Sequence, residues 1–218
     1  MNKDEQFAMQ WLSAGLTDLH ISFVVAAYPE TGVSWYYPNF FVISAMEKIL
    51  KAVLLYEAGS EDRPPLNLDK LAKSYEHKFP KMLKKLREIS GEDAELDSIE
   101  AREICAEPVR DGRWAIKKAG LWSQEARYPN LSPSFKTAEL TAEAYSEILY
   151  GKTTRDLFYD VIRVCIKTMH ARHNEAYTTL VSDIDKIEAG TYAPEWAEKM
   201  PSKFVIHFRE TFFVTETV

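Results

Sequence analysis

The sequence has 218 residues, of which 46% are hydrophobic and 28% charged, and its formal net charge is −6. A chain of this length can bury a hydrophobic core without disulfides or structural metals. Its 8 glycines and 10 prolines are too few for a fibrous protein or a long disordered linker. The negative charge argues against a uniformly basic nucleic-acid-binding surface but allows a local basic patch. We therefore expect a soluble, globular protein.

The cysteines and the N-terminus indicate a cytoplasmic protein with no membrane anchor. Cys105 and Cys165 form no CxxC pair, so the sequence predicts neither a zinc site nor a disulfide framework. The N-terminal MNKDEQ is polar and lacks the apolar core of a signal peptide. The longest uncharged run, Thr31 to Met46, contains Pro38 and is too short to cross a bilayer.

Helical periodicity dominates the first half of the chain. Apolar residues recur every three or four positions over residues 4–27, and again from Pro38 to Glu57, before Gly59. Asn67 is a typical N-cap for the next helix, and Pro80 predicts a kink or a restart before residues 81–90.

The second half continues with helices and ends differently. We predict helices over residues 96–107, 113–122 and 132–151, and one long helix from Thr154 to Ala189. Residues 204–218 alternate between apolar and polar side chains, as a strand does, but no partner strand is evident. The sequence therefore predicts an all-α helical bundle over residues 1–190 and a β-prone C-terminal arm over residues 191–218. The arm either pairs across a homodimer or packs irregularly on the helices.

Two short motifs carry little functional weight. Gly151-Lys152-Thr153 resembles the end of a phosphate-binding loop, but the glycine required five residues earlier is replaced by Ser146. His170 and His173 lie one helical turn apart, yet two histidines alone do not close a metal site. We expect no metal and no cofactor.

A basic stripe is the first candidate contact for RNA. Its residues lie on the helix that follows Tyr75 and are Lys78, Lys81, Lys84, Lys85 and Arg87. Counterion release makes such a stripe a track for phosphates, and a solvated helix face is the alternative.

The most suggestive chemical pair is Arg163 and His170. Seven residues are nearly two helical turns, so both side chains project from one helix face, away from the apolar face. An arginine can hold a phosphate through two hydrogen bonds while a histidine moves a proton, which suits the cleavage of RNA through its own 2′-hydroxyl.

Two stretches of the chain resemble HEPN domains, which are small α-helical bundles of prokaryotic defence and toxin–antitoxin systems. Residues 40–59 are similar to the second-helix pattern of the family, and EARYPN, residues 125–130, is similar to its Arg-Tyr-Pro stretch. The residues that match the helix pattern are Ala45, Glu47, Lys48, Lys51 and Ala52.

The resemblance implies a metal-independent ribonuclease site at a homodimer interface. Active members use an arginine and a histidine separated by four to six residues, a pattern that Arg163 and His170 satisfy. The residues then expected to contact RNA or its phosphates, besides the basic stripe, are Arg127, Lys167, His173 and Asn174. The family also implies a cognate antitoxin as partner. Many members without the full motif are non-catalytic, so a module that binds a nucleotide or a protein is the alternative function.

Overall fold

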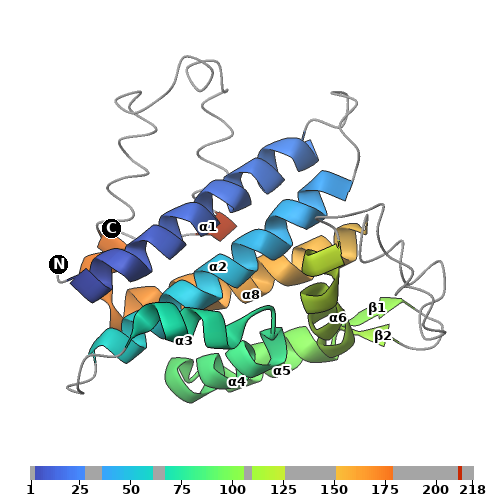
Figure 1. The fold of residues 1–218 in the computed structure, drawn as a ribbon. Coiled ribbons are helices and arrows are strands. Elements are labelled where there is room, and N and C mark those ends of the chain that lie inside the picture. Colours follow the sequence, from blue (N-terminus) through green and yellow to red (C-terminus); the bar gives the residue numbers. More distant parts are fainter. Residues whose placement is uncertain are drawn as a thin grey trace, which may run out of the picture.

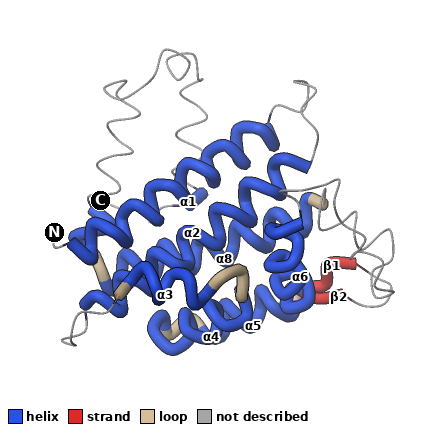
Figure 2. Tube along the Cα trace, viewed as in Figure 1, coloured by secondary structure: helices blue, strands red, loops and turns tan. Residues whose placement is uncertain are grey.

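Helices make up nearly all of the chain that the computed structural model describes, namely residues 3–27, 36–60, 67–105, 110–125, 151–178 and 211–212 (Figure 2). The prediction of an all-α fold is confirmed. The helices are α1 (Lys3–Ala27), α2 (Tyr36–Ser60), α3 (Leu68–Tyr75), α4 (Phe79–Ser90), α5 (Asp93–Ala101), α6 (Gly112–Glu125) and α8 (Lys152–Arg172). The two strands are β1 (Glu103–Cys105) and β2 (Arg110–Asp111).

Helix α2 lies at the centre of the bundle. It packs along α1 on one side and α8 on the other, and it also contacts α3, α4 and α6 (Figure 1). Its sequence is apolar around most of its circumference, which is typical of a helix surrounded by other helices. The fully buried residues of α2 include Val42, Ile43, Met46, Ile49, Leu50, Val53 and Leu55.

Local sequence signals set several helix boundaries as expected. The side chain of Asn67 accepts a hydrogen bond of 3.0 Å from the backbone N–H of Lys70, so it caps α3. Pro80 lies in the first turn of α4, where its missing N–H leaves no helical hydrogen bond unmade. Gly59, in contrast, lies inside α2 and does not cap it.

The predicted helix over residues 96–107 is wrong beyond Ala101. At Arg102 the backbone is extended (φ −62°, ψ 128°), and its carbonyl accepts a hydrogen bond of 2.8 Å from the N–H of Gly112. The chain then forms an antiparallel pair in which β1 faces β2, with Glu103 opposite Asp111. This small hairpin lies at one end of the bundle (Figure 1).

The predicted long helix is interrupted. Helix α8 ends at Arg172, and His173 has a non-helical backbone (φ −135°, ψ 52°) before residues 174–178 become helical again. Residues 179–189 lie outside the described chain.

The C-terminal arm is described only at Thr211 and Phe212, which are helical. Phe212 is buried, and its ring lies 5.2 Å from that of Tyr159 and 5.9 Å from that of Phe23. The rest of the predicted strand, residues 132–150 of the helix predicted over residues 132–151, and the EARYPN stretch beyond Glu125 lie outside the described residues. Within the described residues, no helix combines the length and the apolar character needed to span a membrane.

Candidate functional site

Helix α8 carries a narrow polar stripe along an otherwise buried surface. Its residues recur at spacings of four and three: Asp156, Asp160, Arg163, Lys167 and His170 are half-buried or exposed. The positions between them, such as Phe158, Ile162 and Met169, are buried in the core. The structure therefore places Arg163 and His170 on one face of one helix, outside the core.

The side chain of Arg163 is held by a residue that lies one turn earlier in α8. Its guanidinium donates a hydrogen bond to the carboxylate of Asp160, and 39% of its side chain is exposed. The ring of Phe212 lies beneath it, 5.9 Å from the guanidinium carbon. Asp160 also accepts a hydrogen bond of 2.5 Å from Nη2 of Arg102, which precedes β1.

The side chain of His170 is held by a residue that follows α8. Its ring packs edge-on against that of Tyr177, with the ring centres 4.6 Å apart. At 1.5 Å per residue, the Cα atoms of Arg163 and His170 lie about 10.5 Å apart along the helix axis. Arg163 therefore contacts a residue one turn earlier in α8, whereas His170 contacts Tyr177 of the segment that follows the helix.

His173 belongs to the contact between α8 and α2. Only 12% of its side chain is exposed, its Nε2 lies 3.3 Å from a carboxylate oxygen of Glu57, and its ring packs on Tyr56. Burial lowers the pKa of His173, although Glu57 opposes the shift. Arg172 also binds Glu57, through two hydrogen bonds of 2.5 and 3.1 Å. Asn174 is exposed.

All residues of the predicted basic stripe except Arg87 are exposed, but carboxylates neutralise much of the stripe. Lys78 pairs with Glu76 at 2.7 Å, and Lys85 pairs with Glu88. Arg87 is half-buried, and it joins α4 to α5 through Asp97 and Glu100 at 2.8 and 3.2 Å. Lys81 and Lys84 are exposed. On α8, Lys167 pairs with Glu95 at 2.7 Å. Arg127 lies outside the described residues.

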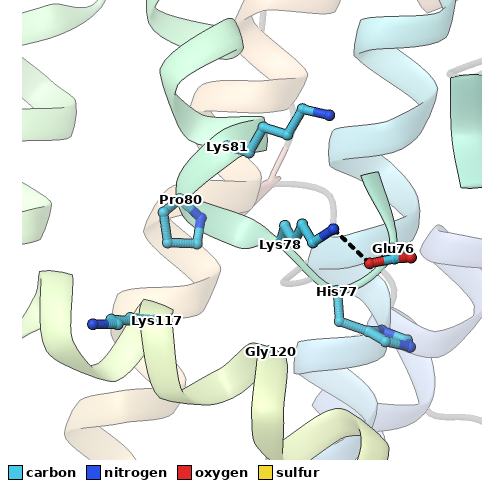
Figure 3. Close-up of a pocket in the computed structure, with 7 residues that line it drawn as sticks. All are labelled: Glu76, His77, Lys78, Pro80, Lys81, Lys117 and Gly120. Atoms are coloured by element: carbon cyan, nitrogen blue, oxygen red, sulfur yellow. Dashed lines mark ion pairs between the residues drawn. The ribbon is translucent and has the colours of Figure 1, made fainter. Parts of the chain in front are cut away.

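An open pocket of about 450 Å³ lies where the turn between α3 and α4 faces α6 (Figure 3). Lys78 and Lys81 of the basic stripe line it, together with Lys117 of α6, which the sequence analysis did not select. The close approach depends on Gly120, because a Cβ atom there would lie 2.2 Å from the carbonyl oxygen of His77. The remaining lining residues are Glu76, His77, Pro80 and Gly120.

His77 connects this pocket to a buried ion pair in α2. Its Nδ1 lies 2.7 Å from one carboxylate oxygen of Glu47, whose other oxygen accepts a hydrogen bond of 2.7 Å from Lys51. The ammonium of Lys51 also lies over the ring of Trp11, 4.9 Å from its centre. Lys48, in the same helix turn, pairs with Asp18 of α1. The charged residues of the HEPN-like pattern in α2 thus hold helices together.

Arg102, Asp160 and Lys117 are not among the residues predicted from the sequence. Asp160 carried a usable signal, because it lies one turn before Arg163 on the same helix face. Arg102 carried none, since it meets Asp160 across 58 positions of the sequence. Within the described residues, no cluster of three or more His, Cys, Asp or Glu side chains is arranged to hold a metal ion.

Comparisons with known proteins identify no relative: no family model, no curated protein and no solved structure matches the chain. The resemblance to HEPN domains rests on the sequence motifs alone.

Proposed function

We propose that this protein is an HEPN-like, metal-independent endoribonuclease that works as a homodimer. The observation that carries the proposal is the shared position of Arg163 and His170 on the polar stripe of α8, outside the core. Both groups are partly exposed and stand on a rigid, mostly buried helix. A rigid support of this kind is what catalytic side chains need for reproducible positioning.

In the proposed reaction the 2′-oxygen of RNA attacks the adjacent phosphorus. The bond from phosphorus to the 5′-oxygen breaks, which leaves a cyclic phosphate and a free 5′-hydroxyl. Arg163 binds the non-bridging phosphate oxygens through its guanidinium fork. His170 moves one proton, either from the attacking 2′-hydroxyl or to the leaving 5′-oxygen, because imidazole changes charge near neutral pH, and solvent water performs the other proton transfer.

The separate contacts of the two groups support a site formed by two chains. Asp160 draws Arg163 towards one end of the stripe, while Tyr177 holds His170 at the other end. In a dimer whose two-fold axis crosses α8, Arg163 of one protomer faces His170 of its partner, and two equivalent sites form. The proposed homodimer is therefore part of the catalytic proposal.

The test is cleavage of single-stranded RNA by the purified full-length protein in excess EDTA. We expect Arg163→Ala and His170→Ala each to lower the rate at least about 100-fold, the size of a typical acid–base contribution. Lys73→Ala is the matched control, because it removes an exposed cation that pairs with Asp69 on α3. A DNA strand of the same sequence stays intact because it lacks the 2′-hydroxyl. Equal cleavage by both site variants would overturn the proposal.

A non-catalytic module that binds a nucleotide is the second candidate, and the lysine-lined pocket favours it. Lys78, Lys81 and Lys117 line this pocket, and Glu76, which pairs with Lys78 at 2.7 Å, is the only carboxylate among the described residues that line it. This candidate predicts no RNA cleavage and an affinity for ATP that Lys81→Ala/Lys117→Ala weakens and Arg163→Ala leaves unchanged. Equilibrium dialysis of the full-length protein measures both affinities.

A further inference from the structure

Two arginines from distant parts of the chain share one carboxylate. Arg102 precedes β1, and Arg163 lies in the middle of α8. Nη2 of Arg102 donates to one oxygen of Asp160 at 2.5 Å, and Nη1 of Arg163 donates to the other. The exposed side-chain fractions are 35% for Arg102, 39% for Arg163 and 17% for Asp160. Asp160 thus brings two guanidinium groups together at the surface.

The backbone on both sides of this cluster is fixed. The N–H of Arg102 donates to the carbonyl of Ile99, and its carbonyl accepts from the N–H of Gly112. A side chain at Gly112 has no room, because its Cβ would lie 2.1 Å from the carbonyl oxygen of Ile99. Asp160 and Arg163 stand on α8 between buried residues such as Tyr159 and Ile162. The two arginines are therefore positioned before any ligand arrives.

The cluster has unused capacity for an anion. Each guanidinium has five N–H donors, and Asp160 accepts one from each arginine. Two positive charges face one negative charge, so the three side chains carry a net charge of +1. Ion pairs whose guanidinium groups are this exposed are weak, so the arginines can exchange the carboxylate for a stronger ligand. One phosphodiester group would neutralise the cluster, and its oxygens match the fork of arginine.

We propose that Arg102 and Arg163 form a clamp for one phosphodiester group of single-stranded RNA, and that Asp160 positions the two arginines while competing with the phosphate for them. This clamp deepens the proposed function, on which its choice of RNA as ligand rests. Arg102 becomes a second phosphate-binding residue beside Arg163. Asp160 is a positioning residue whose carboxylate occupies the clamp in the unbound protein.

The test is the affinity of the full-length protein for a single-stranded RNA with 2′-O-methyl groups, which this chemistry cannot cleave. Fluorescence anisotropy over a range of salt concentrations gives the dissociation constant and its salt dependence. We expect Arg102→Gln to weaken binding about tenfold, the loss of one charged hydrogen-bonding contact. Its plot of log affinity against log salt becomes shallower by about 0.7, the value for one phosphate contact on a single strand.

Asp160→Asn is the decisive partner variant, because it is expected to tighten binding. It removes the competing charge, and a loss of folding cannot produce a gain of affinity. Lys73→Gln and Asp69→Asn are the matched controls, since they remove a cation and a carboxylate from an exposed ion pair on α3. Both controls are expected to leave the affinity within about twofold, because an exposed ion pair outside the clamp and the basic stripe contributes little.

Three results would overturn the clamp: no binding by the parent protein, parental affinity for Arg102→Gln, or weaker binding by Asp160→Asn. The RNA cleavage assay separates this outcome from a failure of the proposed function. A protein that binds the methylated RNA through both arginines but cleaves no RNA retains the clamp and loses the nuclease. A protein that cleaves RNA while Arg102→Gln binds and cleaves normally retains the nuclease and loses the clamp.

Discussion

Glu47 is the residue on which the polar interior depends. It binds Lys51 and His77 with its two oxygens, and only 8% of its side chain is exposed. The side chain of Lys51 is 6% exposed, so its ammonium group is largely desolvated. Such a pair is held in place less by its own attraction than by the cost of leaving one charge buried alone.

Replacing Glu47 alone should destabilise the folded state far more than replacing Glu47 and Lys51 together. We expect Glu47→Ala to lower the free energy of unfolding by about 3–5 kcal/mol, because it strands the charge of Lys51. The double variant Glu47→Leu/Lys51→Met should recover most of this loss. Urea denaturation measures both, and Asp69→Ala, in an exposed pair, should cost at most about 1 kcal/mol. Equal losses for the single and double variants would contradict this explanation.

His173 makes the stability of the protein depend on pH. Burial lowers its pKa below the ordinary value of 6.5, so the folded state disfavours the charged ring. Glu57 and Glu5 favour its charged form, and Arg172 opposes it. As the pH falls below 6.5, the unfolded chain binds a proton that the folded chain does not, and stability decreases until the pH reaches the lowered pKa.

His173→Gln should therefore weaken the pH dependence. Comparing the free energy of unfolding at about pH 7 and about pH 5, we expect a smaller loss in the variant than in the parent protein. Burial also lowers the pKa of His20, so part of the slope remains. An unchanged slope in the variant would mean that the burial of His173 does not produce the effect.

At the scale of elements, the sequence predicts helices well where the signal is local. The heptad-like spacing in residues 4–27, the cap at Asn67 and the proline at position 80 each act within a few residues, and all three appear in the structure. The β1–β2 hairpin escapes prediction because its strands of 3 and 2 residues are too short to show an alternation.

The break at His173 escapes prediction for a different reason. The sequence around it contains neither proline nor glycine, so propensity alone continues the helix. The packing of His173 against Tyr56 and Glu57 of α2 accompanies the break, and this contact joins positions more than 100 residues apart. Tertiary contacts therefore override the local preference at this point.

Phe212 is expected to anchor the C-terminal segment to the bundle. It packs on Tyr159 and Phe23 and lies under Arg163, and it is 3% exposed. Phe212→Ala should lower the free energy of unfolding by about 3–5 kcal/mol, as for other large aromatic residues in a core. Phe212→Leu, which keeps most of the apolar contact, should cost less than about 1.5 kcal/mol. Urea denaturation decides, and a loss below about 1 kcal/mol for Phe212→Ala would contradict this role.

At the scale of the whole molecule, only part of the candidate site could be read from the sequence. Arg163 and His170 are predictable from the sequence because their spacing, together with helix geometry, places them on one face. Arg102 is not predictable in this way, because the hairpin and the close contact at Gly112 bring it to α8. The lysine-lined pocket has the same origin, since Lys117 meets Lys78 only through the packing of α6 on the α3–α4 turn.

The proposed dimer accounts for the positions of Arg163 and His170 in the proposed enzyme. Within one chain, Arg163 pairs with Asp160 and His170 packs on Tyr177, so the proposed catalytic pair is expected to form between chains. A dimer made of Arg163→Ala chains alone, or of His170→Ala chains alone, then has two inactive sites. A mixed dimer of the two variants is different, because one of its sites combines the intact Arg163 of one chain with the intact His170 of the other.

The most direct measurement is RNA cleavage in EDTA by a mixture of Arg163→Ala and His170→Ala after unfolding and joint refolding. Random pairing makes about half of the dimers mixed, and each mixed dimer has one intact site of two. We therefore expect the mixture to recover about a quarter of the parental activity, while each variant refolded alone stays inactive. A mixture that stays as inactive as its components, although refolded parent protein is active, would contradict a site shared between two chains.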